Sequence, residues 1–143
     1  AQIDLAIGLP GRFPTVGRLA TVDLHIGDNR ADWPDDVAAS VGEVDVLMVT
    51  VDDSNHLLTY REVDSLIDRL SPKVVIPMHY QIPGLIPDSA GLLPPDGWLA
   101  THPGVKRLGR HITAFSPEDL PAATQIWVFD PSLDSLAAPI ANP

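Results

Sequence analysis

The stretch Lys73-Val74-Val75-Ile76-Pro77-Met78-His79-Tyr80 decides the fold that we expect for this chain. Its apolar residues predict a short buried strand. A proline lies near the end of this strand, and a histidine follows it. Two earlier segments, Ile26-Gly27-Asp28-Asn29 and Val49-Thr50-Val51-Asp52-Asp53, end in acids in the same way. Because ligands of open α/β sheets collect beyond the carboxyl ends of parallel strands, these three polar ends indicate a site at one edge of a sheet.

The sequence around these strand ends alternates between strand and helix. We expect a strand at Leu19–Ile26, a helix at Asp32–Val41, a strand at Val44–Val51, a helix from the Thr59 cap to Leu70, and a strand at Lys73–Met78. In the first strand, apolar and polar residues alternate, which predicts one buried face. The second strand is a nearly continuous apolar run, which is typical of a strand buried on both faces. This βαβαβ order predicts an α/β fold with parallel neighbouring strands.

The ends of both helices carry recognisable signals. Asp32 is expected to cap the first helix, with Pro34 in its first turn, and Gly42 is expected to end it. Thr59 and Glu62 form the sequence pattern of a capping box at the start of the second helix.

The remaining segments predict shorter elements and loops. The apolar patch Ile3–Ile7 within Ala1–Arg18 predicts a frayed strand, and Gln81–Pro95 predicts a loop over the edge where the site is expected. Beyond it we expect a short helix at Asp96–His102, short strands at Val105–Leu108 and Ile112–Phe115, a strand at Thr124–Phe129 and a loose tail from Asp130.

Length and composition favour one globular domain over residues 1–143, with 45% hydrophobic and 20% charged residues. A net charge of -10 argues against binding to nucleic acid or to an anionic membrane. The absence of cysteine excludes disulfides, thiolate zinc sites and cysteine nucleophiles. The sequence has no basic and then apolar leader. We expect a cytoplasmic protein. A start at Ala1 without methionine leaves open a mature secreted protein, a proteolytic product or an engineered fragment.

His79 and Asp28 are the two residues that we expect to hold a metal. An imidazole and a carboxylate on one rim suit a borderline divalent metal such as zinc. The alternative for Asp28 is a turn aspartate that caps its own backbone. No nucleophile elbow, phosphate-binding loop or dinucleotide fingerprint offers a competing kind of site.

A second group of polar residues is expected to support and orient the metal ligands: His25, Asn29, Asp52, Asp53, His56 and Tyr80. All of them except Asn29 have a simpler alternative. The acids and His56 also suit a polar loop that leads into the Thr59 cap, and His25 and Tyr80 also suit packing. His102 and His111 lie in the turn-rich C-terminal part and are expected to be exposed.

Three spaced segments, Leu24-His25-Ile26-Gly27-Asp28-Asn29, Val44-Asp45-Val46-Leu47-Met48-Val49 and Pro72–Tyr80, resemble the metallo-β-lactamase fold. More narrowly, they resemble the C-terminal half of bacterial metal-dependent hydrolases related to ascorbate-6-phosphate lactonase. In that family an aspartate after a glycine bridges two metal ions, and a histidine after Ile-Pro-Met completes the second metal site. The resemblance covers Leu19–Phe129 and implies that Asp28 and His79 are ligands of a site with two zinc or similar ions.

The chain also departs from the family pattern. The family's remaining ligands come from a His-x-His-x-Asp-His motif and a further histidine upstream, whereas here only His25 precedes Asp28. The resemblance therefore implies half of an αββα sandwich, without the second sheet and with fewer ligands than the three or more of a catalytic zinc site.

Two functions follow as alternatives. In the first, the chain is part of a zinc-dependent hydrolase in which metal-activated water attacks an ester, lactone or phosphoester bond of a small molecule. In the second, it is a truncated or degenerate relative that acts as a binding or self-associating module. In either case, we expect the missing N-terminal half or a second copy of the chain as the partner that covers the sheet.

Overall fold

The structure is a computed structural model of the whole chain, and it describes residues 5–6, 21–27, 32–53 and 57–132. Its elements are, in order, β1 (Leu5–Ala6), β2 (Asp23–His25), α1 (Asp35–Val41), β3 (Val46–Thr50), α2 (Tyr60–Leu70), β4 (Val74–Met78), η1 (Asp88–Ala90), α3 (Asp96–Leu99), β5 (Val105–Arg107), η2 (Pro117–Asp119) and β6 (Gln125–Val128). No described helix is long and apolar enough to cross a membrane.

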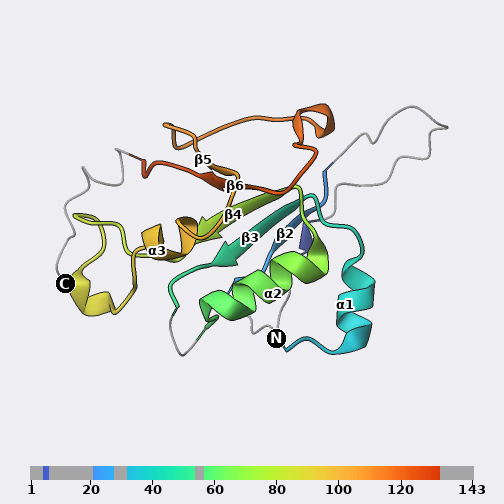
Figure 1. Cartoon of the computed structure of the whole chain (residues 1–143), viewed down its shortest axis with the longest axis horizontal. Coiled ribbons are helices and arrows are strands. Elements are labelled where there is room, and N and C mark those ends of the chain that lie inside the picture. The colour runs from blue at the N-terminus through green and yellow to red at the C-terminus, as the bar shows by residue number, and fades with distance from the viewer. Residues whose placement is uncertain (1–4, 7–20, 28–31, 54–56, 133–143) are drawn as a thin grey trace.

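The described strands form one sheet in the order β1-β2-β3-β4-β6-β5. All neighbours pair in parallel except β1, which runs antiparallel to β2. The predicted βαβαβ unit and α/β class are therefore confirmed. Because β2, β3 and β4 are parallel, their carboxyl ends lie on the same edge of the sheet, which Figure 1 shows on the side of α3.

Helix α2 begins and ends as its sequence predicts. The backbone amide of Thr59 donates to Glu62 Oε2 at 2.8 Å, and the amide of Glu62 donates to Thr59 Oγ1 at 3.3 Å, so the capping box is formed. Val63 and Leu66 are buried against the sheet. Ser71, with φ +46°, ends the helix directly before Pro72.

Helix α1 begins later than predicted. It starts at Asp35, and Pro34 occupies the N-cap position without a side-chain cap. The prediction that Asp32 is the cap is therefore wrong. The proline has no amide to donate and its extended backbone marks the boundary, so the helix begins at Asp35 and not directly after Asp32. Gly42 follows the helix with φ +66°, as expected.

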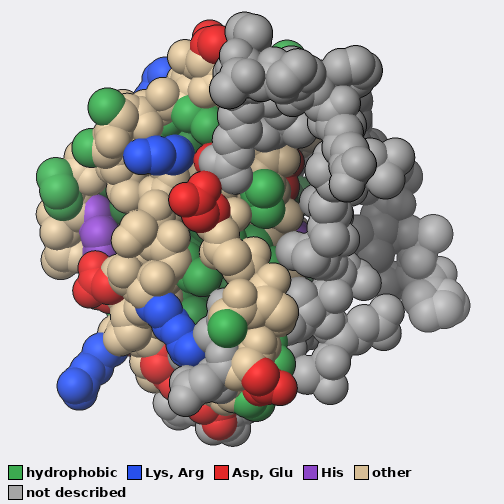
Figure 2. Space-filling view, turned by 90° about the vertical axis from the view of Figure 1, so that its right-hand side faces the viewer, with side chains coloured by type: hydrophobic (Ala, Val, Ile, Leu, Met, Phe, Trp, Pro, Cys, Tyr) green, Lys and Arg blue, Asp and Glu red, His purple; other side chains and the backbone are tan. Residues whose placement is uncertain are grey.

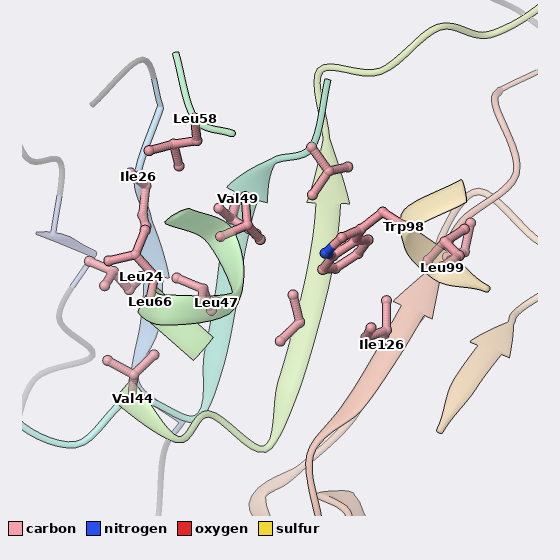
Figure 3. Close-up of a cluster of buried hydrophobic side chains, with 14 residues drawn as sticks. Leu24, Ile26, Val44, Leu47, Val49, Leu58, Leu66, Trp98, Leu99 and Ile126 are labelled. Atoms are coloured by element: carbon pink, nitrogen blue, oxygen red, sulfur yellow. The ribbon is translucent and has the colours of Figure 1, made fainter. Parts of the chain in front are cut away.

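The main core lies between the sheet and the helices (Figure 3). Leu24, Leu47, Val75 and Ile126 occupy one row across β2, β3, β4 and β6, because the parallel register aligns them. The ring of Trp98, which is 2% exposed, packs on this row from α3. The same face receives Val63 and Leu66 of α2.

The opposite face of the sheet carries a smaller cluster of Val46, Val74 and Trp127. Phe115 covers Trp127 with its ring edge-on, at a centroid distance of 5.5 Å, and Lys106 lies 5.2 Å from the same ring. β3 and β4 are thus apolar on both faces, which explains their nearly continuous apolar sequences.

The C-terminal part differs from the prediction at two places. Ile112–Phe115 is not a strand, and its Phe115 instead packs on the sheet from a loop. The helix expected at Asp96–His102 is confined to Asp96–Leu99. Strand β6 confirms the strand expected at Thr124–Phe129 and lies between β4 and β5.

Candidate functional site

The candidate site lies where the chain leaves β3 and β4, two neighbouring parallel strands. Thr50 and Met78 are partners in the register at the last position of each strand, and the amide of Val51 donates to the carbonyl of Met78 at 3.0 Å. The residues that follow, Asp52 and His79, therefore emerge side by side at the same edge of the sheet.

These two residues are in contact. His79 Nδ1 lies 3.1 Å from Asp52 Oδ2. The carboxylate is fully buried, whereas the side chain of His79 is 39% exposed. Because a buried carboxylate is costly without a hydrogen-bond partner, this contact stabilises Asp52 and restrains the imidazole of His79.

The backbone at the site is also unusual. His79 has φ +53° and Asp53 has φ +50°, so both adopt the left-handed conformation that costs an ordinary residue about 1–2 kcal/mol. Such conformations cluster at functional sites, where the surrounding structure holds them. His79 adopts this conformation directly after β4, and its side chain is 39% exposed.

Asp53 connects the site to helix α2. Its Oδ1 accepts a hydrogen bond from the amide of Tyr60 at 2.9 Å. Together with the Thr59 capping box, this bond gives partners to the amides of Thr59, Tyr60 and Glu62 at the start of the helix. The segment that carries Asp52 is therefore anchored at β3 on one side and at α2 on the other.

Two tyrosines lie near this edge. The ring of Tyr80 packs against the main core. Burial raises the pKa of its hydroxyl, Arg107 lowers it in part, and Asp130 and Asp96 add to the rise. Tyr60 donates to the carbonyl of Pro94 at 3.3 Å, which attaches the end of the loop after β4 to α2. Burial, and then the charges of the nearby aspartates, raise the pKa of Tyr60.

The other predicted site residues divide into two groups. His25 is exposed at the end of β2, beside Met48 of β3 and on the face opposite Leu24. Asp28, Asn29 and His56 lie outside the described residues. The structure thus brings Asp52 and His79 together, and the expected ligand role of Asp28 stays a prediction.

The described residues fit one part of a metal site. His79 combines a partly exposed imidazole with a carboxylate on Nδ1, which is the arrangement typical of metal-bound histidines. Within the described ranges, no three His, Asp or Glu side chains gather in a way that could hold an ion. His79 therefore fits as a single zinc ligand, and further ligands have to come from elsewhere.

One polar cluster was not predicted from the sequence. Trp98 Nε1 donates to Asp64 Oδ1 at 2.7 Å, and His102 Nε2 lies 3.1 Å from the same oxygen. The side chain of His102 is 20% exposed and stacks near Trp98, so the expectation that it is exposed is wrong. Its partner Asp64 is far away in the sequence, and no local sequence pattern predicts this contact. The exposure expected for His111 is confirmed.

A buried acid at the opposite edge of the sheet has a structural role. Asp45 is 3% exposed, and its Oδ2 accepts from the amide of Val22 at 2.8 Å. The bond joins the starts of β2 and β3, away from the candidate site. An acid inside an otherwise apolar strand was the only sequence signal for it.

Over the described part of the surface in Figure 2, acidic and basic side chains are scattered among hydrophobic ones. No basic patch gathers there, in keeping with the net charge of -10.

Residues 21–79 match the family model described as a beta-lactamase superfamily domain, and the matched segment ends on His79. No curated protein matches the chain significantly.

Among solved structures, the chain is similar to a Thermotoga maritima protein provisionally described as a Zn-dependent hydrolase of the metallo-β-lactamase superfamily. The two sequences are 29% identical, and the structures align with a TM-score of 0.59 over 72% of this chain and 50% of that chain. The chain thus spans half the length of the solved protein that it matches. The predicted fold class, half of a metallo-β-lactamase-type sandwich, is confirmed.

Proposed function

We propose that this chain is the C-terminal half of a zinc-dependent hydrolase that cleaves an ester, lactone or phosphoester bond in a small molecule. The observation that carries the proposal is the contact of His79 with buried Asp52 at the carboxyl edge of β3 and β4. It lies within the segment that matches the beta-lactamase superfamily domain. The likeness to a protein provisionally described as a Zn-dependent hydrolase supports the same function.

In this proposal His79 and Asp28 are metal ligands, and the complete site holds two ions. When bound, zinc would activate water for attack and polarise the bond to be cleaved. The chain's own contribution is to hold the imidazole of His79 at the edge of the sheet through its contact with Asp52.

A second half of the fold is needed because catalytic zinc sites use at least three protein ligands. The chain spans half of the solved protein that it resembles, so we propose that the N-terminal half of the same fold supplies the remaining ligands. That half would lie on the sheet face that carries Val46 and Met48. A second copy of the chain is the alternative occupant.

The test compares the chain alone with the chain co-produced with an N-terminal half of the fold. We expect weak or no zinc binding by the chain alone in calorimetry. The assembled protein should contain zinc and hydrolyse a substrate from a panel of esters, lactones and phosphodiesters. Asp28→Ala and His79→Ala should remove both zinc and activity, whereas His111→Ala, an exposed histidine far along the chain, should change neither.

Full zinc content and full activity in the Asp28→Ala and His79→Ala assemblies would overturn the proposal. An assembly that binds no zinc, together with self-association of the chain in sedimentation, would favour the non-catalytic binding module.

A further inference from the structure

We propose that Asp52 is a positioning residue that sets the tautomer of His79. Its carboxylate keeps the proton of the neutral imidazole on Nδ1, so that His79 can reach a metal only through Nε2. The role of Nε2 rests on the proposed function, but the choice of tautomer is a property of the chain itself.

The chemistry of the contact fixes the proton. An ionised carboxylate has no proton to donate and only accepts hydrogen bonds. With Asp52 Oδ2 at 3.1 Å, Nδ1 of His79 must carry the proton for the contact to be favourable. Because Asp52 is fully buried, water does not compete for its carboxylate, and a charge-assisted hydrogen bond is stronger there than at the surface.

The position of Asp52 is determined on both sides. One residue earlier, the amide of Val51 is bound to Met78 in β4. One residue later, Asp53 is bound to the amide of Tyr60 at the start of α2. The backbone that carries the carboxylate is therefore held by the sheet on one side and by the helix cap on the other.

His79 is restrained at its backbone as well. His79 follows β4 directly and has a φ of +53°, so the end of the strand sets the direction of its side chain. Asp52 then fixes the remaining freedom, the rotation of the ring and the position of its proton. Preorganised ligands of this kind lose less conformational entropy when a metal binds.

The replacement Asp52→Asn tests the tautomer with almost no change in size. An asparagine amide can donate as well as accept, so it does not enforce a proton on Nδ1. We expect the protein to show mainly the Nδ1–H form of His79, and Asp52→Asn to shift the population towards the Nε2–H form that histidine prefers in water. The measurement is two-bond ¹H–¹⁵N NMR of the histidine rings, with the His79 signals assigned by their absence in His79→Ala.

A matched control comes from another carboxylate–imidazole contact among the residues that the structure describes. Asp64→Asn changes the partner of His102 and should leave the tautomer of His79 unchanged. If His79 is mainly Nε2–H in the unsubstituted chain, the inference is wrong whether or not Asp52→Asn folds. An unchanged His79 tautomer in folded Asp52→Asn would refute it equally.

A second readout is the zinc affinity of the assembled protein. Asp52→Asn should weaken zinc binding by about 10–100-fold, the usual effect of removing the partner of a metal-bound histidine. If the assembly binds no zinc at all, the proposed function fails while the NMR result still decides the role of Asp52. If zinc binds and Asp52→Asn has no effect on its affinity, the proposed function stands and the positioning role fails.

Discussion

At the end of β4, the backbone of His79 adopts a conformation that glycine tolerates better than any other residue. The chain has a histidine there in spite of the strain in its backbone conformation. This choice is explained if the imidazole has a function that outweighs the lost stability.

The strain can be measured with a pair of substitutions at this position. His79→Gly and His79→Ala both remove the imidazole from buried Asp52, so they share that loss. Only alanine retains the strained φ of +53°, and His79→Gly should therefore be more stable than His79→Ala by about 1 kcal/mol. Urea unfolding checks the difference, and an alanine variant as stable as the glycine variant would show that the backbone is not strained.

The two tyrosines of the chain, Tyr60 and Tyr80, give a second prediction at the residue scale. Burial is the largest cause of a raised pKa in both, so each phenol should ionise above its ordinary value of 10.0. The neutral phenols contribute stability that is fully present below pH 10 and is lost as the pH rises through the folded-state pKa.

Phenolate absorbance during an alkaline titration checks this, with circular dichroism confirming that the chain stays folded. The same titration of the urea-unfolded chain is the control. Coinciding curves for the folded and unfolded chain would contradict the raised pKa of the two hydroxyls.

Sequence reasoning at this scale succeeded where the evidence was local. His79 and Asp52 follow directly on predicted strands, so the parallel arrangement alone brought them to one edge. The contacts of Asp64 with Trp98 and His102 join residues more than 30 positions apart, and only the tertiary packing of α3 on α2 creates them.

Among the elements, helix α2 matters most to the site because Asp53 and Thr59 tie its start to the segment after β3. The capping box was predictable, since its two residues stand three positions apart in the sequence. The start of α1 was not, because two candidate boundary residues, Asp32 and Pro34, compete within one turn.

The capping box gives a prediction for this element. Thr59→Ala removes the hydroxyl that accepts from the amide of Glu62, and should lower the free energy of unfolding by about 1 kcal/mol. Ser65→Ala is the matched control, because Ser65 is exposed in the same helix and donates only to the carbonyl of Arg61. Its effect should stay within about 0.5 kcal/mol. Equal urea midpoints for the two variants would mean that the cap does not stabilise α2.

The C-terminal elements show where element prediction failed. Ile112–Phe115 has the composition of a strand, but Phe115 packs edge-on against Trp127 and the segment pairs with no strand. A β-rich composition indicates a side chain that suits a half-buried surface, and a loop over a sheet provides such a surface too.

For the whole molecule, the sequence predicted the class of the fold and the parallel strands whose ends bring Asp52 and His79 together. It did not predict that β6 lies between β4 and β5, since strand order beyond consecutive βαβ units depends on long-range pairing. Both faces of β3 and β4 bear apolar residues, and the described helices cover one of these two faces. The proposed second half of the fold would complete the other face and the metal site together.

The most direct test of this account is the position of zinc in crystals of the chain assembled with an N-terminal half of the fold. Diffraction recorded on both sides of the zinc absorption edge locates the metal without reference to any substrate. The account predicts an anomalous peak about 2.0–2.1 Å from His79 Nε2, with Nδ1 still facing Asp52. Zinc bound away from His79, or coordinated through Nδ1, in an assembly that hydrolyses its substrate would contradict it.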